Sequence, residues 1–346
     1  MNYLSNKLAK ALHSPSFSNN RKSTSLTPSS ASTIVTDSKG NTRVVGACHR
    51  QQFYKIKDWT PDDGDKNIDW TLAALMGEKM HDLLVDLIDL YGFEMGLQKL
   101  TREHSIYDPA IKLSGRCDLI VWDTTAKEPV GVEIKSIGEY KAKKAVEQPI
   151  DEHVLQSVVY LDFYNRNIPD GQKKIKKWYI WYVSRTENWT IKSKSHNSDF
   201  TMLWDYCIEL DNGVPIITLT DGTKQRWTDY SIENIYKRYN QLNTYLQDNT
   251  LPPRDYEILY SEEKITGMFK NGLISKKGDL EIIEKWLKKG APPGKLKVTM
   301  GDSECSFCEY HKLCWEGLQS TGRKKFANLP DDTQNEKPEK KNTFFI

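Results

Sequence analysis

Two short stretches decide the fold of this chain: Gly-Arg-Cys-Asp at 115–118 and Val-Gly-Val-Glu-Ile-Lys at 130–135. The apolar run Leu-Ile-Val-Trp follows Asp118, and apolar residues alternate through the second stretch, so both patterns indicate β-strands. The intervening Asp-Thr-Thr-Ala-Lys-Glu-Pro is typical of a turn, which predicts that the strands pair as a hairpin. Glu133 and Lys135 would then share one face, predicted to be opposite the buried face, and Asp118 would lie near them.

Asp118, Glu133 and Lys135 would place two carboxylates and one ammonium on a single surface. Carboxylate oxygens are the ligands that Mg²⁺ and Mn²⁺ prefer, and a lysine can orient or deprotonate an attacking water. The three residues therefore predict a divalent-metal site for hydrolysis. The alternative is a solvated sheet face on which charged cross-strand pairs contribute only to stability.

Two predicted helices carry further polar residues. Segment 69–91 has apolar residues at helical spacing, and Gly77 and His81 share a face because they are four residues apart. Segment 152–166 places Gln156 and Tyr160 on one face in the same way. Taken alone, these are also the features of an ordinary solvated or core histidine and an ordinary polar stripe.

Together these motifs resemble the signature of the PD-(D/E)xK nuclease superfamily. Asp118 and the Glu133-Ile-Lys135 triplet resemble its catalytic motif, and Gln156 with Tyr160 resembles the Q-x-x-x-Y motif of the RecB-like branch. The resemblance implies an α/β fold with a restriction-endonuclease-like core, in which a mixed central sheet is flanked by helices.

The resemblance also implies a role for each residue. His81 matches the histidine of a Gly-x-x-x-His element and would bind the metal with Asp118 and Glu133, and its imidazole would shift the preference from Mg²⁺ toward Mn²⁺. Lys135 would activate or position water. The residues implied in catalysis are Asp118, Glu133, Lys135, Gln156 and Tyr160, the last two by contact with the DNA strand and the reacting phosphate.

Four cysteines form a second candidate site: Cys48 before these motifs and Cys305, Cys308 and Cys314 after them. In a reducing compartment, clustered cysteines are more often ligands of a metal or cluster than disulfides. Zinc suits Cys₄ and Cys₃His sites, in which His49 or His311 could take part. Cys117 and Cys207 lack partners in the sequence and are expected to be buried thiols.

The cysteine spacing resembles the iron–sulfur branch of RecB-like nucleases, which includes CRISPR-associated RecB-like exonucleases and the AddB nuclease domain. There one cysteine precedes the nuclease core and three follow it, and together they hold a [4Fe–4S] cluster. Cys48-His49-Arg50 resembles the Cys-Pro-Arg element of that branch, with His in place of Pro. The resemblance, which extends in scattered motifs from Cys48 to Trp315, implies an iron–sulfur cluster that joins the N- and C-terminal segments.

Several other elements follow from local patterns. A strand is expected to end at Glu103, where an acidic residue of this family often helps the site, although a surface charge is an equal alternative. Lysines after Lys135 form a basic stretch that is either a solvated face or a contact for a phosphate backbone. The other predicted elements are strands at 32–36, 42–45, 177–184, 202–210 and 215–219 and a helix at 231–246.

The domain organisation follows from composition. We expect a flexible N-terminal arm at 1–31, one nuclease domain at 32–320 with a helical insertion near 256–297, and a disordered tail at 321–346. The tail ends on Phe-Phe-Ile, which suggests a docking peptide for a sliding clamp or a single-strand-binding protein. The alternative is a frayed end or an apolar tip that folds back onto the domain.

The formal net charge of +2 over 346 residues excludes a globally basic nucleic-acid binder, so any DNA-binding surface must be local. No apolar run approaches the eighteen or so residues of a membrane helix. The expected location is cytoplasmic, in a bacterial host cell if the protein is phage-encoded, as its Lys-, Asn-, Tyr- and Ile-rich composition suggests. A mitochondrial location is the alternative.

The predicted function is metal-dependent exonucleolytic cleavage of DNA that has a free end or is single-stranded, in recombination, repair or degradation. One alternative is a structure-specific or restriction-like endonuclease. An alternative of another class is a non-catalytic DNA-binding assembly factor, against which the complete set of Asp118, Glu133 and Lys135 argues.

Overall fold

The computed structural model describes residues 25–59, 68–186, 202–290, 294 and 296–315. The chain divides into two compact units. The first comprises Met1–Ala47 and Asp65–Thr244, and the second comprises Cys48–Gly64 and Tyr245–Ile346. A short segment from the first part of the chain therefore belongs to the same unit as the C-terminal part.

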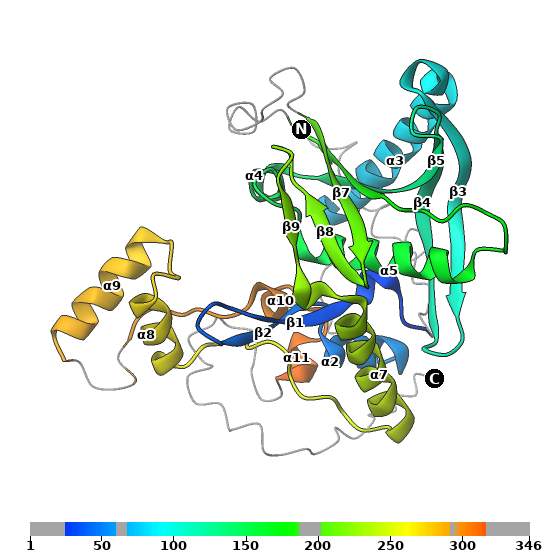
Figure 1. The fold of residues 1–346 in the computed structure, drawn as a ribbon. Helices are drawn as coiled ribbons and strands as arrows, with labels where there is room; N and C mark the ends of the chain where they lie inside the picture. Colours follow the sequence, from blue (N-terminus) through cyan, green and yellow to red (C-terminus); the bar gives the residue numbers. More distant parts are fainter. Residues whose placement is uncertain (1–24, 60–67, 187–201, 291–293, 295, 316–346) are drawn as a thin grey trace, which may run out of the picture. The chain divides into compact units, whose positions relative to one another are not determined.

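The first unit is built on a seven-stranded mixed sheet (Figure 1). The predicted α/β class, a mixed sheet flanked by helices, is confirmed. Each described strand of this sheet neighbours the next one in the chain, and only β5 and β6 pair in parallel. The strands are β3 (Leu97–Asp108), β4 (Leu113–Asp123), β5 (Glu128–Ile137), β6 (Trp178–Ser184), β7 (Leu203–Asp211), β8 (Val214–Thr218) and β9 (Lys224–Arg226).

The hairpin predicted from the sequence is present as β4 and β5. Leu119 pairs with Val132 in antiparallel register, which sets Asp118 level with Glu133. The prediction that Glu133 and Lys135 share a face is confirmed by their mutual ion pair. The prediction that this face is the exposed one is wrong, because Glu133 is only 2% exposed. A parallel β5–β6 pair needs a crossover connection, and the helices of such a connection cover the sheet.

Helix α5 (Asp151–Asn167) covers the face that carries Glu133. It follows the shorter α4 (Glu139–Ala145) in the crossover from β5 to β6, and it confirms the helix predicted at 152–166. Its Tyr160 ring stacks on Trp178 of β6, with ring centroids 5.7 Å apart and an interplanar angle of 17°.

Helix α3 (Ile68–Met95) packs on the other face through Leu84, Ile88 and neighbouring apolar side chains, which share one core cluster with residues of β4, β5 and β6. The predicted helix at 69–91 is confirmed, although α3 runs four residues further. It ends before Gly96, whose φ of +68° is typical of the left-handed residue that follows a helix.

Residues 25–31, which we predicted to belong to a flexible arm, pack into the first unit. Leu26 is 1% exposed and forms an isolated parallel bridge with Leu113. The rest of the predicted arm, 1–24, lies outside the described residues.

A separate two-stranded sheet confirms the predicted hairpin of β1 (Ser32–Thr36) and β2 (Thr42–Gly46). It is preceded by the short helix η2 (Pro28–Ser30). Gly46 has a φ of +95°, and a Cβ there would lie 2.3 Å from the Ala31 carbonyl oxygen, so only glycine fits this position.

Strand β3 is longer than the sequence predicts. We expected it to end at Glu103, but it continues to Asp108. The ladder to β4 shifts register between Lys99 and Thr101, and Glu103 adopts a φ of +49°. This irregularity interrupts the period-2 pattern by which a continuous strand is recognised.

The predicted strand at 177–184 and the predicted hairpin near 202–219 are confirmed as β6, β7 and β8. Asn212 and Gly213 connect β7 to β8 with φ of +51° and +78°, the paired positive values that a two-residue type I′ turn requires.

The first unit closes with three elements. Strand β9 was not predicted, because its three residues are all exposed and polar. The short helix η3 (Thr228–Tyr230) leads into α7 (Ile232–Asp248), which confirms the helix predicted at 231–246.

The second unit contains only helices and loops among its described residues. The region predicted to be a helical insertion has a small core of its own, formed by Ile265, Ile274, Ile283 and Val298. No helix in the described part of the chain is long and apolar enough to cross a membrane. The helices of this unit are α2 (His49–Ile56), α8 (Glu262–Lys270), α9 (Lys277–Lys288), α10 (Ser303–Ser306) and α11 (His311–Cys314).

The close approach of Gly131 to Trp178 yields a stability prediction. A Cβ at position 131 would lie 2.1 Å from Trp178 Cε3, and Trp178 is fully buried. We expect Gly131→Ala to lower the free energy of unfolding by about 2–3 kcal/mol, measured by urea denaturation. Gly267→Ala, at a helical position with open space around it, should be neutral or stabilise by about 1 kcal/mol. Equal effects of the two variants would contradict the packing argument.

Candidate active site

A chain of hydrogen bonds joins β5 to α5. The Lys135 Nζ donates to Glu133 Oε1 at 2.7 Å and to Gln156 Oε1 at 2.9 Å. The Gln156 Nε2 donates to the Tyr160 hydroxyl at 3.4 Å, which donates to the Arg116 carbonyl at 2.7 Å. Because the amide oxygen and nitrogen of Gln156 have different partners, this chain fixes the orientation of the amide and, through it, the Lys135 ammonium.

Asp118 completes the group predicted from the hairpin. Its Oδ2 accepts a hydrogen bond from the Ile134 backbone N–H at 2.8 Å and lies 3.6 Å from the His81 Nδ1. Burial, together with the positive charge of Lys135, lowers the pKa of His81 below 6.5. The imidazole is therefore neutral near pH 7, which is the form that can bind a metal ion.

Glu133 is in the least favourable environment of these residues. Its Oε1 pairs with Lys135, whereas its Oε2 is buried and has no hydrogen-bond partner among the described residues. Burial raises the pKa of Glu133 to about 7 and also raises the pKa of Asp118. An additional positive charge beside these two carboxylates would therefore be favourable.

The donors present fit Mg²⁺ or Mn²⁺. Asp118 and Glu133 supply carboxylate oxygens, His81 supplies an imidazole nitrogen, and the unpartnered Oε2 is an acceptor that a cation would satisfy. In the part of the chain that the structure describes, no three side chains of His, Cys, Asp or Glu are already arranged as metal ligands. A bound ion would thus require these side chains to rotate toward it.

Glu103, for which we expected either a role at the site or a surface position, lies level with Asp118 on β3. Its carboxylate accepts a hydrogen bond from Arg116 at 2.7 Å, and both side chains are about half exposed. It is therefore a surface ion pair at the edge of the site. The pKa of Asp118 is raised mainly by the burial of Asp118 itself, and the nearby negative charge of Glu103 raises it further.

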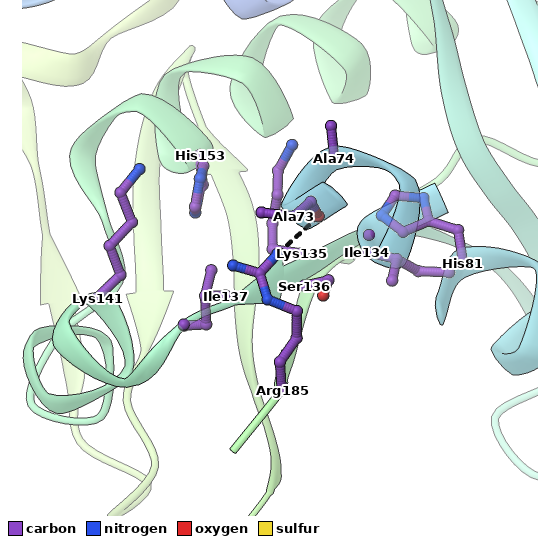
Figure 2. Close-up of a pocket in the computed structure, with 12 residues that line it drawn as sticks. Ala73, Ala74, His81, Ile134, Lys135, Ser136, Ile137, Lys141, His153 and Arg185 are labelled. Carbon is purple, nitrogen blue, oxygen red and sulfur yellow. Dashed lines mark hydrogen bonds between the residues drawn. The ribbon is translucent and has the colours of Figure 1, made fainter. Parts of the chain in front are cut away.

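A cavity of about 370 Å³ opens beside this group. The small residues Ala73, Ala74 and Gly77 of α3 form one wall and leave the space open. Figure 2 shows His81 to one side of Lys135, Lys141 and His153 to the other, and Arg185 below Lys135 in this view. The cavity therefore continues from the predicted metal ligands toward the ends of β5 and β6.

Sequence reasoning did not single out Ser136, His153 or Arg185, all of which line this cavity. Two signals could have identified His153 and Arg185. His153 lies one helical turn before Gln156 and so shares its face. Arg185 follows β6, and the carboxyl ends of two parallel strands meet at one edge of a sheet, where ligands commonly bind.

The three lysines of the predicted basic stretch lie in different environments. Lys141 lines the cavity, Lys143 pairs with Glu139 on the same helix, and Lys144 is exposed and does not line the cavity. One of the three lysines is therefore in a position to contribute to the site, and the other two belong to a solvated surface.

The four predicted cluster ligands all lie in the second unit. Burial raises the pKa of Cys48 to about 11 and that of Cys308 to about 12. The negative charge of Cys314 contributes to both of these shifts, and those of Cys48 and Cys314 contribute to the raised pKa of Cys305. These mutual effects indicate that the thiols lie in one region of the second unit, although no three of them are already arranged as ligands of a metal within the described residues.

Hydrogen-bond donors lie beside two of these cysteines. The Tyr310 backbone N–H lies 3.4 Å from Cys308 Sγ, and Arg50 Nη1 lies 3.9 Å from Cys314 Sγ. Arg254 donates to the Cys314 carbonyl at 2.8 Å. Such donors would compensate the negative charge of thiolates around an iron–sulfur cluster or a zinc ion, so the donor set fits either.

The prediction of a buried thiol is confirmed for Cys117, which lies in β4 of the first unit, and is wrong for Cys207, which is only partly buried. Cys207 on β7 is half-buried and shares a hydrogen bond with Tyr179. Neither belongs to the cysteine group of the second unit.

Comparison with known proteins adds no assignment. No protein-family model matches the chain, and no curated protein is significantly similar to it in sequence.

The buried carboxylate of Glu133 makes stability depend on pH. Its pKa is about 7 in the folded protein and 4.5 as a reference, so the folded state binds more protons between these values and stability falls as pH rises through them. We expect Glu133→Gln, measured without metal, to gain about 2–3 kcal/mol relative to wild type between pH 5 and pH 8. The wild type forms the ion pair with Lys135 at pH 8 but not at pH 5. The folded pKa of about 7 already includes this attraction, so the expected gain is net of the ion pair that the variant lacks. A difference independent of pH would contradict the assignment.

Replacing one cysteine of the second unit tests whether the four predicted cysteines bind a metal or cluster. We expect Cys308→Ser to lower the thermal midpoint of anaerobically purified protein and to remove its bound metal, because the ligands connect segments more than two hundred residues apart. Absorbance in the blue and metal analysis distinguish an iron–sulfur cluster from zinc. Cys207→Ser, in the first unit, is the control and should retain both colour and metal. Unchanged metal content in Cys308→Ser would contradict the ligand assignment.

Proposed function

We propose that the protein is a metal-dependent deoxyribonuclease that hydrolyses phosphodiester bonds of DNA, acting as an exonuclease on a restriction-endonuclease-like core. The observation that carries this proposal is the hydrogen-bonded group of Glu133, Lys135 and Gln156 beside Asp118. A purely structural sheet face would be solvated and would not bury an unpartnered carboxylate oxygen.

Asp118, Glu133 and His81 would hold Mg²⁺ or Mn²⁺. When bound, the ion would stabilise negative charge on the phosphate and lower the pKa of a coordinated water. The neutral state of His81 and the excess negative charge of the two carboxylates both favour binding of a cation.

Lys135 would orient the attacking water. An ammonium has three donors, and in the described structure two of them are used by Glu133 and Gln156. The third remains for a water or a phosphate oxygen. Because the other two are fixed, this donor has a defined direction, which is what positioning of a nucleophile requires.

Gln156 and Tyr160 would support Lys135. They are 9% and 3% exposed, and each is already engaged in the chain of hydrogen bonds that ends at Arg116. Their direct contact with DNA stays a prediction. A positioning role is favoured by the partners that they have.

In the second unit, Cys48, Cys305, Cys308 and Cys314 would hold a [4Fe–4S] cluster, with zinc as the rival. The N–H donors beside two of the sulfur atoms favour this proposal, because such donors stabilise thiolates that ligate a cluster. The cluster would join the segment around Cys48 to the C-terminal segment. The predicted docking tail at 321–346 lies outside the described residues.

The experiment is cleavage of end-labelled linear DNA with Mn²⁺. Lys135→Ala should lower the rate about 100-fold or more, the usual contribution of a positioned acid–base group, while the binding of DNA persists. Lys176→Ala is the matched control, because Lys176 is an exposed lysine that pairs with Glu128 away from this group.

A closed circular substrate separates the alternatives. Loss of linear DNA alone supports an exonuclease, and loss of both substrates supports an endonuclease. Full activity of Lys135→Ala would refute the site assignment. Wild-type protein that binds DNA but cleaves neither substrate would be the non-catalytic binding module.

A further inference from the structure

The cavity beside Lys135 has an unusual distribution of charge. None of its lining residues is acidic, whereas Lys135, Lys141 and Arg185 are basic. Lys135 is compensated by Glu133. Within the described residues, Lys141 and Arg185 form no ion pair, and the Arg185 Nη1 donates only to the neutral carbonyl of Ala73 at 3.0 Å (Figure 2). The cavity thus holds two positive charges for which the described residues supply no ion-pair partner.

His153 adds a neutral donor to the same wall. The Tyr182 hydroxyl accepts a hydrogen bond from the Ile150 backbone N–H at 2.9 Å and lies 2.9 Å from His153 Nδ1. Because the Tyr182 oxygen already accepts from Ile150, its hydroxyl proton is donated to His153 Nδ1. The neutral imidazole of His153 then carries its own proton on Nε2. Burial and the charges of Lys135 and Lys141 hold the pKa of His153 well below 6.5, so the ring is neutral near pH 7.

Ser136 supplies a further polar group. Its hydroxyl is buried and has no hydrogen-bond partner within the described residues, yet the residue lines the cavity between Lys135 and Ile137. Hydroxyl, imidazole and guanidinium donors together with an ammonium are the set that recognises phosphate oxygens. This hydroxyl is therefore available to donate to a group that enters the cavity.

We propose that this cavity binds the terminal phosphomonoester of a nucleic-acid strand, held by Lys141, Arg185 and the donors of His153 and Ser136. A terminal phosphate carries nearly two negative charges at neutral pH, which match the two uncompensated cations, whereas an internal phosphodiester carries one. The inference rests on the proposed nuclease function for its placement, because the cavity adjoins Lys135 and His81. It makes the exonuclease selective for a phosphorylated strand end.

The test measures binding without cleavage. Fluorescence anisotropy in EDTA gives the Kd of single-stranded oligonucleotides of one sequence that carry a 5′-phosphate, a 3′-phosphate or hydroxyls at both ends. We expect the wild type to bind one phosphorylated oligonucleotide about tenfold more tightly than the hydroxyl form, the effect of one charge-assisted hydrogen bond. The preferred end then defines the polarity. Lys141→Ala should abolish this preference, and since Lys141 is exposed, the variant should fold normally.

Lys144→Ala is the matched control, because Lys144 lies on the same helix and does not line the cavity. It should retain the tenfold preference. Wild-type protein without any preference would overturn the proposal, as would Lys141→Ala that weakens binding of all three oligonucleotides equally, the behaviour of a contact to an internal phosphate.

The two proposals fail separately in this design. Cleavage with Mn²⁺ but no preference for a phosphorylated end would leave the nuclease function intact and refute the terminal-phosphate subsite. A preference that Lys141→Ala removes, in a protein that cleaves no DNA, would support the subsite and refute the nuclease function.

Discussion

Burial of the Glu133 carboxylate is the constraint on which the candidate site depends. A carboxylate at 2% exposure costs several kcal/mol unless it is paired, and one of its oxygens has no partner among the described residues. The ion pair with Lys135 offsets part of this cost, and Gln156 holds Lys135 in place. The part of the burial cost that Lys135 does not offset favours binding of a cation. The site is thus locally destabilised without a cation, and this same property suits it to its proposed chemistry.

The parallel pairing of β5 and β6 places this carboxylate under a helix. All other neighbours in the described sheet are antiparallel and can be connected by short turns, but this pair requires the crossover through α4 and α5. The crossover brings Gln156 and His153 over the carboxyl end of β5, and it brings Arg185 to the adjacent end of β6. The same connection therefore builds both the candidate catalytic group and the positively charged cavity next to it.

The two units would carry different chemistry under the proposed function, and each assembles its candidate site from segments that are distant in sequence. The first brings α3, β4, β5 and α5 together around Asp118 and Glu133. The second brings Cys48 to the three C-terminal cysteines, where Arg50 and Arg254 contribute positive charge. A ligand that joins Cys48 to Cys305 closes a long loop and would stabilise that unit by restricting its unfolded state.

The β4–β5 hairpin, the level position of Asp118 and Glu133, and the principal helices could be predicted from the sequence, because period and turn chemistry are local properties. The sequence could not show that the face of Glu133 and Lys135 is buried, since α5 covers that face only after the crossover forms. The sequence pattern did not predict that β3 continues past Glu103, because a positive φ at Glu103 breaks the alternation of buried and exposed residues. Nor did it identify Ser136, His153 and Arg185. Only tertiary structure brings those three together, because their proximity follows from the pairing of β5 with β6 and from no pattern along the chain.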